Sequence, residues 1–227
     1  GPDFVEFTAL SAKHGDGWGI ASSTSNSAKP DLLVEPGRAK ESETYSKATS
    51  TISSKAALLH LRWATLGLSI TEGNTHPFVS GDISFIHNGG IKPPASLDVG
   101  IDPKYFAQMR GDTDSERYFY YLLTKVDNSD FKNGIVDGVR EISEGFDFSS
   151  INAMMMTPDY LVVICEHNNE KIPDDEGPDY YELYYRKDER GVLIASTGWT
   201  QDGWKNLPNH HIMFVDRKSH EVEIISL

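Results

Sequence analysis

The chain has 227 residues, of which 38% are hydrophobic and 11% aromatic, and its formal net charge is −13. This length and composition are typical of one globular domain, and no apolar run is long enough to cross a bilayer. The negative charge would repel a phosphate backbone and anionic lipids, since no cluster of Lys and Arg offsets it, so we expect neither nucleic acid nor a membrane as a partner.

In chain order, the apolar spacing of Phe4, Phe7 and Leu10 predicts a short helix, and a glycine-rich turn then leads into a strand. Residues 22–54 are rich in Ser, Thr, Lys and Glu, which predicts an exposed connection with one short strand near 32–34. Residues 56–65 predict a strand buried on both faces, followed by a loop to Phe78. The next strand begins at Ile83 and is expected to end in a turn at "HNGG".

After Pro93 and Pro94, residues 112–126 predict a helix with an Asp or Thr cap and an acidic first turn, and residues 134–144 predict a second helix. The remainder reads as short strands, one of which contains the only cysteine, Cys165. A single buried cysteine allows no internal disulfide and fits a reducing, cytoplasmic setting. Because the strands do not alternate with helices, this order favours a single α+β layered sandwich over residues 1–227 rather than a doubly wound sheet.

Five polar or glycine-rich groups stand at the ends of predicted strands or at a helix start, where a rigid scaffold usually presents functional groups. They are "HGDGWG" at 14–19, "LRWAT" at 61–65, "NTHPF" at 74–78, "HNGG" at 87–90 and "GDTDSE" at 111–116. In this order they resemble the stand-alone class II glutamine amidotransferases, which are N-terminal-nucleophile hydrolases, and the similarity extends to "GVLIAST", Trp204 and "IMFVD" downstream.

The resemblance implies a four-layer αββα sandwich of mainly antiparallel sheets that hydrolyses the side-chain amide of glutamine and releases ammonia, without a cofactor. Glutamine carries an α-carboxylate and an α-ammonium, so its pocket needs one fixed cation and one fixed anion, and Arg62 and Asp114 match those positions. A guanidinium presents parallel donors to a carboxylate, which a lysine cannot do. The alternative for Arg62 is an ordinary surface residue, and for Asp114 it is a helix cap or first-turn residue.

Attack on an amide carbonyl places negative charge on its oxygen. The resemblance implies that the side-chain amide of Asn88 and the backbone N–H of Gly89 form an oxyanion hole for that charge. Glycine has no Cβ and lets the backbone approach closely. The alternative is that Asn-Gly is simply the turn of a hairpin.

Other motif residues have supporting roles in this interpretation. Trp63 and Thr65 would shape the glutamine pocket, Asp16 and Gly17 would lie near the N-terminus of the intact protein, and His76 would support the site. Several histidines raise the possibility of a metal site, but they form no compact H-x-H or H-x-x-x-H pair and no cysteine joins them, so we expect no metal.

The nucleophile of the family is an N-terminal cysteine, whose own α-amino group serves as the base. The sequence as given begins with Gly1 and does not contain that cysteine or its strand, so we expect this chain to be inactive. Two other functions stay open: a non-catalytic glutamine-binding protein or regulatory subunit, and a γ-glutamyl amide hydrolase in thiol biosynthesis. Any use of the ammonia would depend on a separate synthase subunit.

Overall fold

The computed structural model describes residues 1–24, 29–65 and 67–227. The strands are β1 (Gly17–Ser23), β2 (Asp31–Glu35), β3 (Ala56–Arg62), β4 (Phe78–Ser80), β5 (Ile83–Lys92), β6 (Asp147–Met156), β7 (Tyr160–Cys165), β8 (Leu183–Asp188), β9 (Gly191–Ser196), β10 (Lys205–Leu207), β11 (His211–Asp216) and β12 (Val222–Ser226). The α-helices are α1 (Pro2–Ala9), α2 (Glu43–Thr51), α3 (Pro103–Phe106), α4 (Asp114–Asp127) and α5 (Phe131–Gly145).

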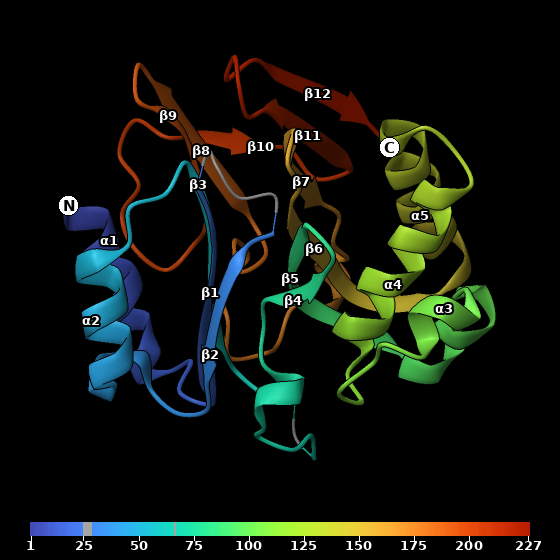
Figure 1. The fold of residues 1–227 in the computed structure, drawn as a ribbon, viewed down its shortest axis with the longest axis horizontal. Coiled ribbons are helices and arrows are strands. Elements are labelled where there is room, and N and C mark those ends of the chain that lie inside the picture. The colour runs from blue at the N-terminus through green and yellow to red at the C-terminus, as the bar shows by residue number, and fades with distance from the viewer. Residues whose placement is uncertain (25–28, 66) are drawn as a thin grey trace.

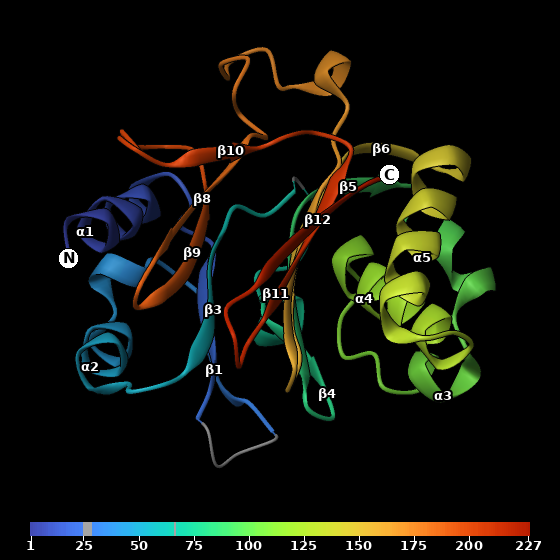
Figure 2. The same ribbon diagram turned by 90° about the horizontal axis from the view of Figure 1, so that it is seen from above.

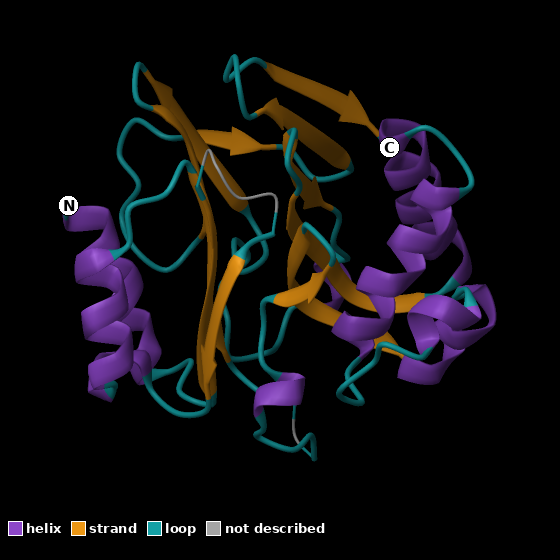
Figure 3. Ribbon diagram, viewed as in Figure 1, coloured by secondary structure: helices purple, strands orange, loops and turns teal. Residues whose placement is uncertain are grey.

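These elements form four layers, as the expected αββα sandwich requires (Figure 1). Helices α1 and α2 cover one side, and α3, α4 and α5 cover the other (Figures 1 and 3). Two β layers lie between the helices. The one on the α1 and α2 side (Figure 2), called the outer layer below, contains two antiparallel three-stranded sheets, ordered β2-β1-β3 and β10-β8-β9. The one on the α4 and α5 side, called the inner layer, is one antiparallel six-stranded sheet, ordered β12-β11-β7-β6-β5-β4. The view from above shows β3 and β9 in the same β layer (Figure 2), where they belong to different sheets. The fold class predicted from the sequence is confirmed.

Each pair of layers has its own apolar core. The largest core packs α4 and α5 against the six-stranded sheet, with Phe85, Tyr118 and Phe119 among its buried aromatic rings. A second core places Trp18 and Leu61 of the outer layer against Tyr45 of α2. Cys165 lies in a third core, with Leu183 and Met213. No helix in the described ranges has the length and apolar character needed to span a bilayer.

Two local predictions were wrong. The connection predicted over 22–54 contains helix α2, which has Ser42 as its cap and only Tyr45 and Ala48 buried, too few apolar positions to show a period. Strand β4 begins at the last residue of the predicted loop, and a short helix, α3, lies in a segment for which no element was predicted. Strand β5 does not stop at a turn: it continues through Asn88 and Gly89 to Lys92. Residues 25–28 of the predicted connection and residue 66 of the predicted loop lie outside the described residues.

Candidate active site

The site forms where the outer sheet, the inner sheet and the start of α4 meet. Arg62 is the last residue of β3 and is only 4% exposed. Its Nη2 donates to the carbonyl of Ser69 at 3.2 Å, while Nη1 is buried with no hydrogen-bond partner among the described residues. Burial lowers the pKa of Arg62, although Asp16 and Asp112 oppose this shift. A buried guanidinium nitrogen without an acceptor is costly, so this geometry is suited to an anionic ligand.

A short series of hydrogen bonds connects Arg62 to the start of α4. Asn74 donates through Nδ2 to the same Ser69 carbonyl, at 3.2 Å, and to Asp112 Oδ1, at 2.7 Å. The backbone N–H of Asp112 donates back to Asn74 Oδ1 at 3.0 Å. Asp112 stands two residues before Asp114, so direct contacts join the "NTHPF" and "GDTDSE" motifs, and the shared Ser69 carbonyl joins "LRWAT" to "NTHPF". Asn74 and Asp112 have structural roles that the sequence reasoning did not assign.

Asp114 is the first residue of α4 and is 8% exposed. Its Oδ2 accepts the backbone N–H of Ile91 at 2.8 Å, which places the carboxylate beside the β5 segment that carries Asn88 and Gly89. The helix cap is Thr113, whose hydroxyl accepts the N–H of Glu116 at 3.1 Å. Asp114 is therefore a first-turn residue, and its carboxylate is directed at β5 rather than at the helix backbone.

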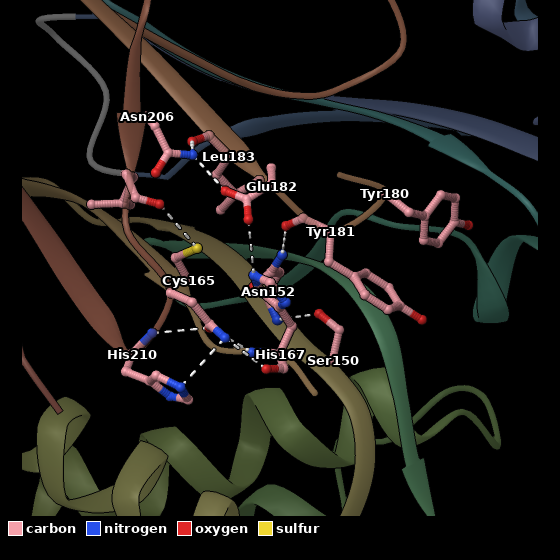
Figure 4. Close-up of polar contacts among 12 residues, drawn as sticks. Ser150, Asn152, Cys165, His167, Tyr180, Tyr181, Glu182, Leu183, Asn206 and His210 are labelled. Carbon is pink, nitrogen blue, oxygen red and sulfur yellow. Dashed lines mark hydrogen bonds and ion pairs between the residues drawn. The ribbon is translucent and has the colours of Figure 1, made fainter. Parts of the chain in front are cut away.

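Asn88 and Gly89 lie inside β5, so the hairpin-turn alternative is wrong. Gly89 has φ +142°, and a Cβ placed on it would lie 2.0 Å from the carbonyl oxygen of Ser150. The Cα of Gly89 therefore faces strand β6. Glycine is required here because the backbone of β5 comes this close to Ser150. Asn88 and Asn152 of β6 both line one large cavity. Asn152 Nδ2 donates to the carbonyl of Tyr181 (Figure 4), and Asn152 Oδ1 accepts the N–H of Glu166.

That cavity has a volume of about 1020 Å³ and separates two strand edges of the outer layer. It is lined by Ala57–Leu61 of β3 and by Val192–Ser196 of β9, each the last strand of its sheet in the described part of the chain. Successive side chains of a strand point to opposite faces, so five consecutive lining residues mean that the cavity follows the strand edge itself. Unpaired strand edges readily pair with another extended segment.

The remaining predicted positions lie around this centre. Asp16 Oδ2 accepts the N–H of Ala64 at 2.8 Å and fixes the segment after Arg62. Gly17 begins β1 and pairs with Arg62. Trp63 is 44% exposed and lies under the Lys13 ammonium, 4.9 Å from its ring centroid. Thr65 is exposed, and its carbonyl accepts the N–H of Leu68 at 3.0 Å.

The buried histidines form a neutral layer behind the site. The rings of His60 and His76 lie 4.2 Å apart, and neither ring nitrogen of His76 has a hydrogen-bond partner in the described ranges. Burial lowers the pKa of His60 to about 3, lowers that of His76 well below its usual value, and lowers that of His87. Among the described residues, no three His, Cys, Asp or Glu side chains are grouped to hold a metal ion.

Comparison with known proteins identifies the family of this chain. A family model described as class-II glutamine amidotransferases matches residues 3–224. The chain belongs to the class II glutamine amidotransferase family. An uncharacterized protein of Methanocaldococcus jannaschii is 25% identical over 230 residues, which cover 91% of this chain and 62% of that protein. The glutamine–fructose-6-phosphate aminotransferase of Wigglesworthia glossinidia brevipalpis is 32% identical over 120 residues, covering 52% of this chain and 17% of the enzyme. The amidotransferase chain therefore spans less than two thirds of the length of these relatives.

Solved structures share the fold of this amidotransferase. A class-II domain protein from Silicibacter pomeroyi superposes with a TM-score of 0.69 at 16% identity, covering 94% of this chain and 96% of that chain. The glutamine phosphoribosylpyrophosphate amidotransferase of B. subtilis superposes with a TM-score of 0.63 at 14% identity, covering 99% of this chain and 46% of that one. At these identities the likeness concerns the fold.

Proposed function

We propose that this amidotransferase hydrolyses the side-chain amide of glutamine to glutamate and ammonia. The observation that carries the proposal is the buried Arg62 guanidinium, whose Nη1 has no hydrogen-bond partner in the part of the chain that the structure describes. Bound glutamine would direct its α-carboxylate to Arg62 and its α-ammonium to Asp114. The side-chain amide would then extend towards Asn88 and Gly89. Asn88 Nδ2 and the Gly89 N–H would donate to the carbonyl oxygen as it becomes negative.

The nucleophile in this proposal is a cysteine at the N-terminus of the full-length protein, upstream of Gly1. The cavity between β3 and β9 supports it, because an extended segment entering there would pass beside Asn88. Cys165 is unsuited to the role: its thiol is fully buried, donates to the carbonyl of Leu207 at 3.3 Å, and has its pKa raised by burial to about 12.

The proposed reaction proceeds in two steps. The α-amino group takes the proton of the thiol, the thiolate attacks the amide carbon, and the tetrahedral intermediate collapses to a thioester as that proton passes to the leaving nitrogen, which departs as ammonia. Water then attacks the thioester, which releases glutamate and restores the thiol. A separate synthase subunit would consume the ammonia.

The test uses the full-length protein from its natural start. We expect it to release glutamate from glutamine and to be labelled at its N-terminal cysteine by a glutamine-mimicking electrophile. The 227-residue chain and the Cys→Ala variant should release none. Arg62→Lys should raise KM by about 10-fold to 100-fold, because hydrogen bonds to charged groups contribute roughly 1.5–3 kcal/mol. Arg190→Lys, at an arginine whose side chain is 84% exposed, is the matched control and should leave KM unchanged.

Other outcomes would identify the alternatives. A natural start without cysteine, combined with glutamine binding and no turnover, would indicate a pseudoenzyme or regulatory subunit. Faster hydrolysis of γ-glutamyl amides than of glutamine would indicate a γ-glutamyl amide hydrolase. Full activity of Arg62→Lys would contradict the assignment of the carboxylate site.

A further inference from the structure

Ser150 of β6 contacts the proposed oxyanion segment through both its side chain and its backbone. It is 0% exposed. Its hydroxyl donates to the carbonyl of Asn88 at 2.9 Å and accepts the N–H of Asn152 at 3.0 Å. Its own carbonyl lies 3.1 Å from His87 Nε2. No motif in the sequence includes this serine.

The β5–β6 ladder is irregular at this position. Gly89 pairs with Ile151, but Ile91 pairs with Phe148, so two residues of β6 stand opposite Gly90. A bulge of this kind interrupts the ladder and re-aims the strand. The Ser150 hydroxyl holds the Asn88 carbonyl there, while the Ser150 carbonyl occupies the space that a side chain at position 89 would need.

The donor and the acceptor in each hydrogen bond of this network follow from the chemistry of the groups. A carbonyl can only accept, so His87 Nε2 donates to Ser150 O, and in the neutral ring Nδ1 accepts from the hydroxyl of Ser115, 2.9 Å away. The continuous series therefore runs from Ser115 to His87, to Ser150 and to Asn88. Ser115 follows Asp114 in α4, so the series connects the proposed ammonium site to the proposed oxyanion hole.

We propose that Ser150 is a positioning residue that fixes the Asn88–Gly89 peptide for stabilisation of the tetrahedral intermediate. The inference rests on the proposed glutaminase function. Ser150 itself does not touch the substrate in this arrangement, because its hydroxyl and carbonyl are both engaged by β5 and β6. Losing its hydroxyl should therefore impair an interaction made in the transition state and leave ground-state binding at Arg62 intact.

The experiment compares the full-length wild type with Ser150→Ala. Because loss of one oxyanion donor typically costs about 10² to 10³ in rate, a displaced peptide should lower kcat about 10-fold to 100-fold with KM within about 2-fold. The Kd for glutamine, measured with the N-terminal Cys→Ala change in both proteins, should stay within about 2-fold. Ser84→Ala is the matched control and should retain kcat, since Ser84 is also 0% exposed on β5 and its hydroxyl has no partner among the described residues.

A second variant distinguishes loss of the hydrogen bond from misfolding. Ser150→Cys keeps the shape of the side chain but has only a weak donor, and we expect kcat to fall by about 3-fold to 10-fold. Wild-type kcat in either folded Ser150 variant would overturn the positioning role and leave the glutaminase proposal standing. A KM that rises in step with the loss of kcat/KM would also overturn it, because that result indicates a collapsed pocket. An inactive full-length wild type would instead refute the glutaminase function itself.

Discussion

Gly89 illustrates how one residue can satisfy two requirements. Its φ of +142° is a conformation that other residues rarely adopt, and its Cα touches the backbone of Ser150, where a Cβ would lie only 2.0 Å from the carbonyl oxygen. From the sequence, the glycine is expected to let the backbone approach closely at the oxyanion hole. The structure shows that the close neighbour is strand β6, so the residue is needed for folding as well as for the proposed oxyanion hole.

Gly89→Ala should therefore destabilise the protein by more than about 3 kcal/mol, since backbone strain of about 1–3 kcal/mol adds to a steric clash. Gly81→Ala is the matched control, because Gly81 also has positive φ, +58°, but nothing lies within 4 Å of its added Cβ. Its cost should be about 1 kcal/mol, the strain of an alanine held in the left-handed conformation. Denaturant unfolding of both variants measures the difference, and equal costs would contradict the assignment of the clash to Ser150.

At the scale of single elements, the start of α4 organises the site. Thr113 caps the helix, and the Glu116 carboxylate accepts the backbone N–H groups of Arg110 and Gly111 at 2.9 and 2.8 Å. These contacts leave Asp114 free of capping and direct it to Ile91 of β5. The position of the proposed ammonium site thus depends on a local feature, an N-terminal cap, that the sequence predicted as Asp or Thr.

Thr113→Ala should cost about 1 kcal/mol of stability and raise KM for glutamine in the full-length enzyme by severalfold, because the first turn that carries Asp114 loosens. Ser42→Ala removes the equivalent cap from α2, where the Ser42 hydroxyl accepts the N–H of Tyr45 at 3.0 Å. That variant should lose similar stability with KM unchanged. Unfolding curves and steady-state kinetics test the pair, and a matching rise in KM for Ser42→Ala would refute the local explanation.

At the scale of the whole molecule, the layered packing places three histidines where they are neutral. His60 extends from β3 and His87 belongs to β5, while His76 precedes β4, so the three come together only when the two sheets stack. Burial is the first cause of each lowered pKa. The unfolded chain, in which a histidine has a pKa near 6.5, binds more protons than the folded protein below that pH.

The free energy of unfolding should consequently be highest above about pH 6.5 and fall as the pH decreases from there towards 3, the folded-state pKa of His60. Each buried histidine contributes a slope of at most about 1.4 kcal/mol per pH unit. His76→Gln should make this slope shallower, while its stability curve runs parallel to the wild type above pH 7. Denaturant unfolding across the pH range tests this, and an unchanged slope would show that His76 titrates normally.

The sequence alone is enough to predict the longer strands and helices α1, α4 and α5 in their order, because these elements have clear periodicity or recognisable caps. It also identifies the five motifs, which stand at predicted strand ends or at a predicted helix start. Helix α2 and strand β4 were missed because so few of their residues carry an apolar pattern; their structure depends on packing against neighbours.

Only the tertiary structure decided how the motifs meet. The contacts from Asn74 to Asp112, from Asp114 to Ile91 and from Ser150 to Asn88 each join segments between 23 and 62 residues apart. Spacing along the chain contains no information about such contacts, because they depend on which strands become neighbours and where the β5–β6 register shifts. A buried serine also has no pattern of its own until the groups that it bonds are fixed around it.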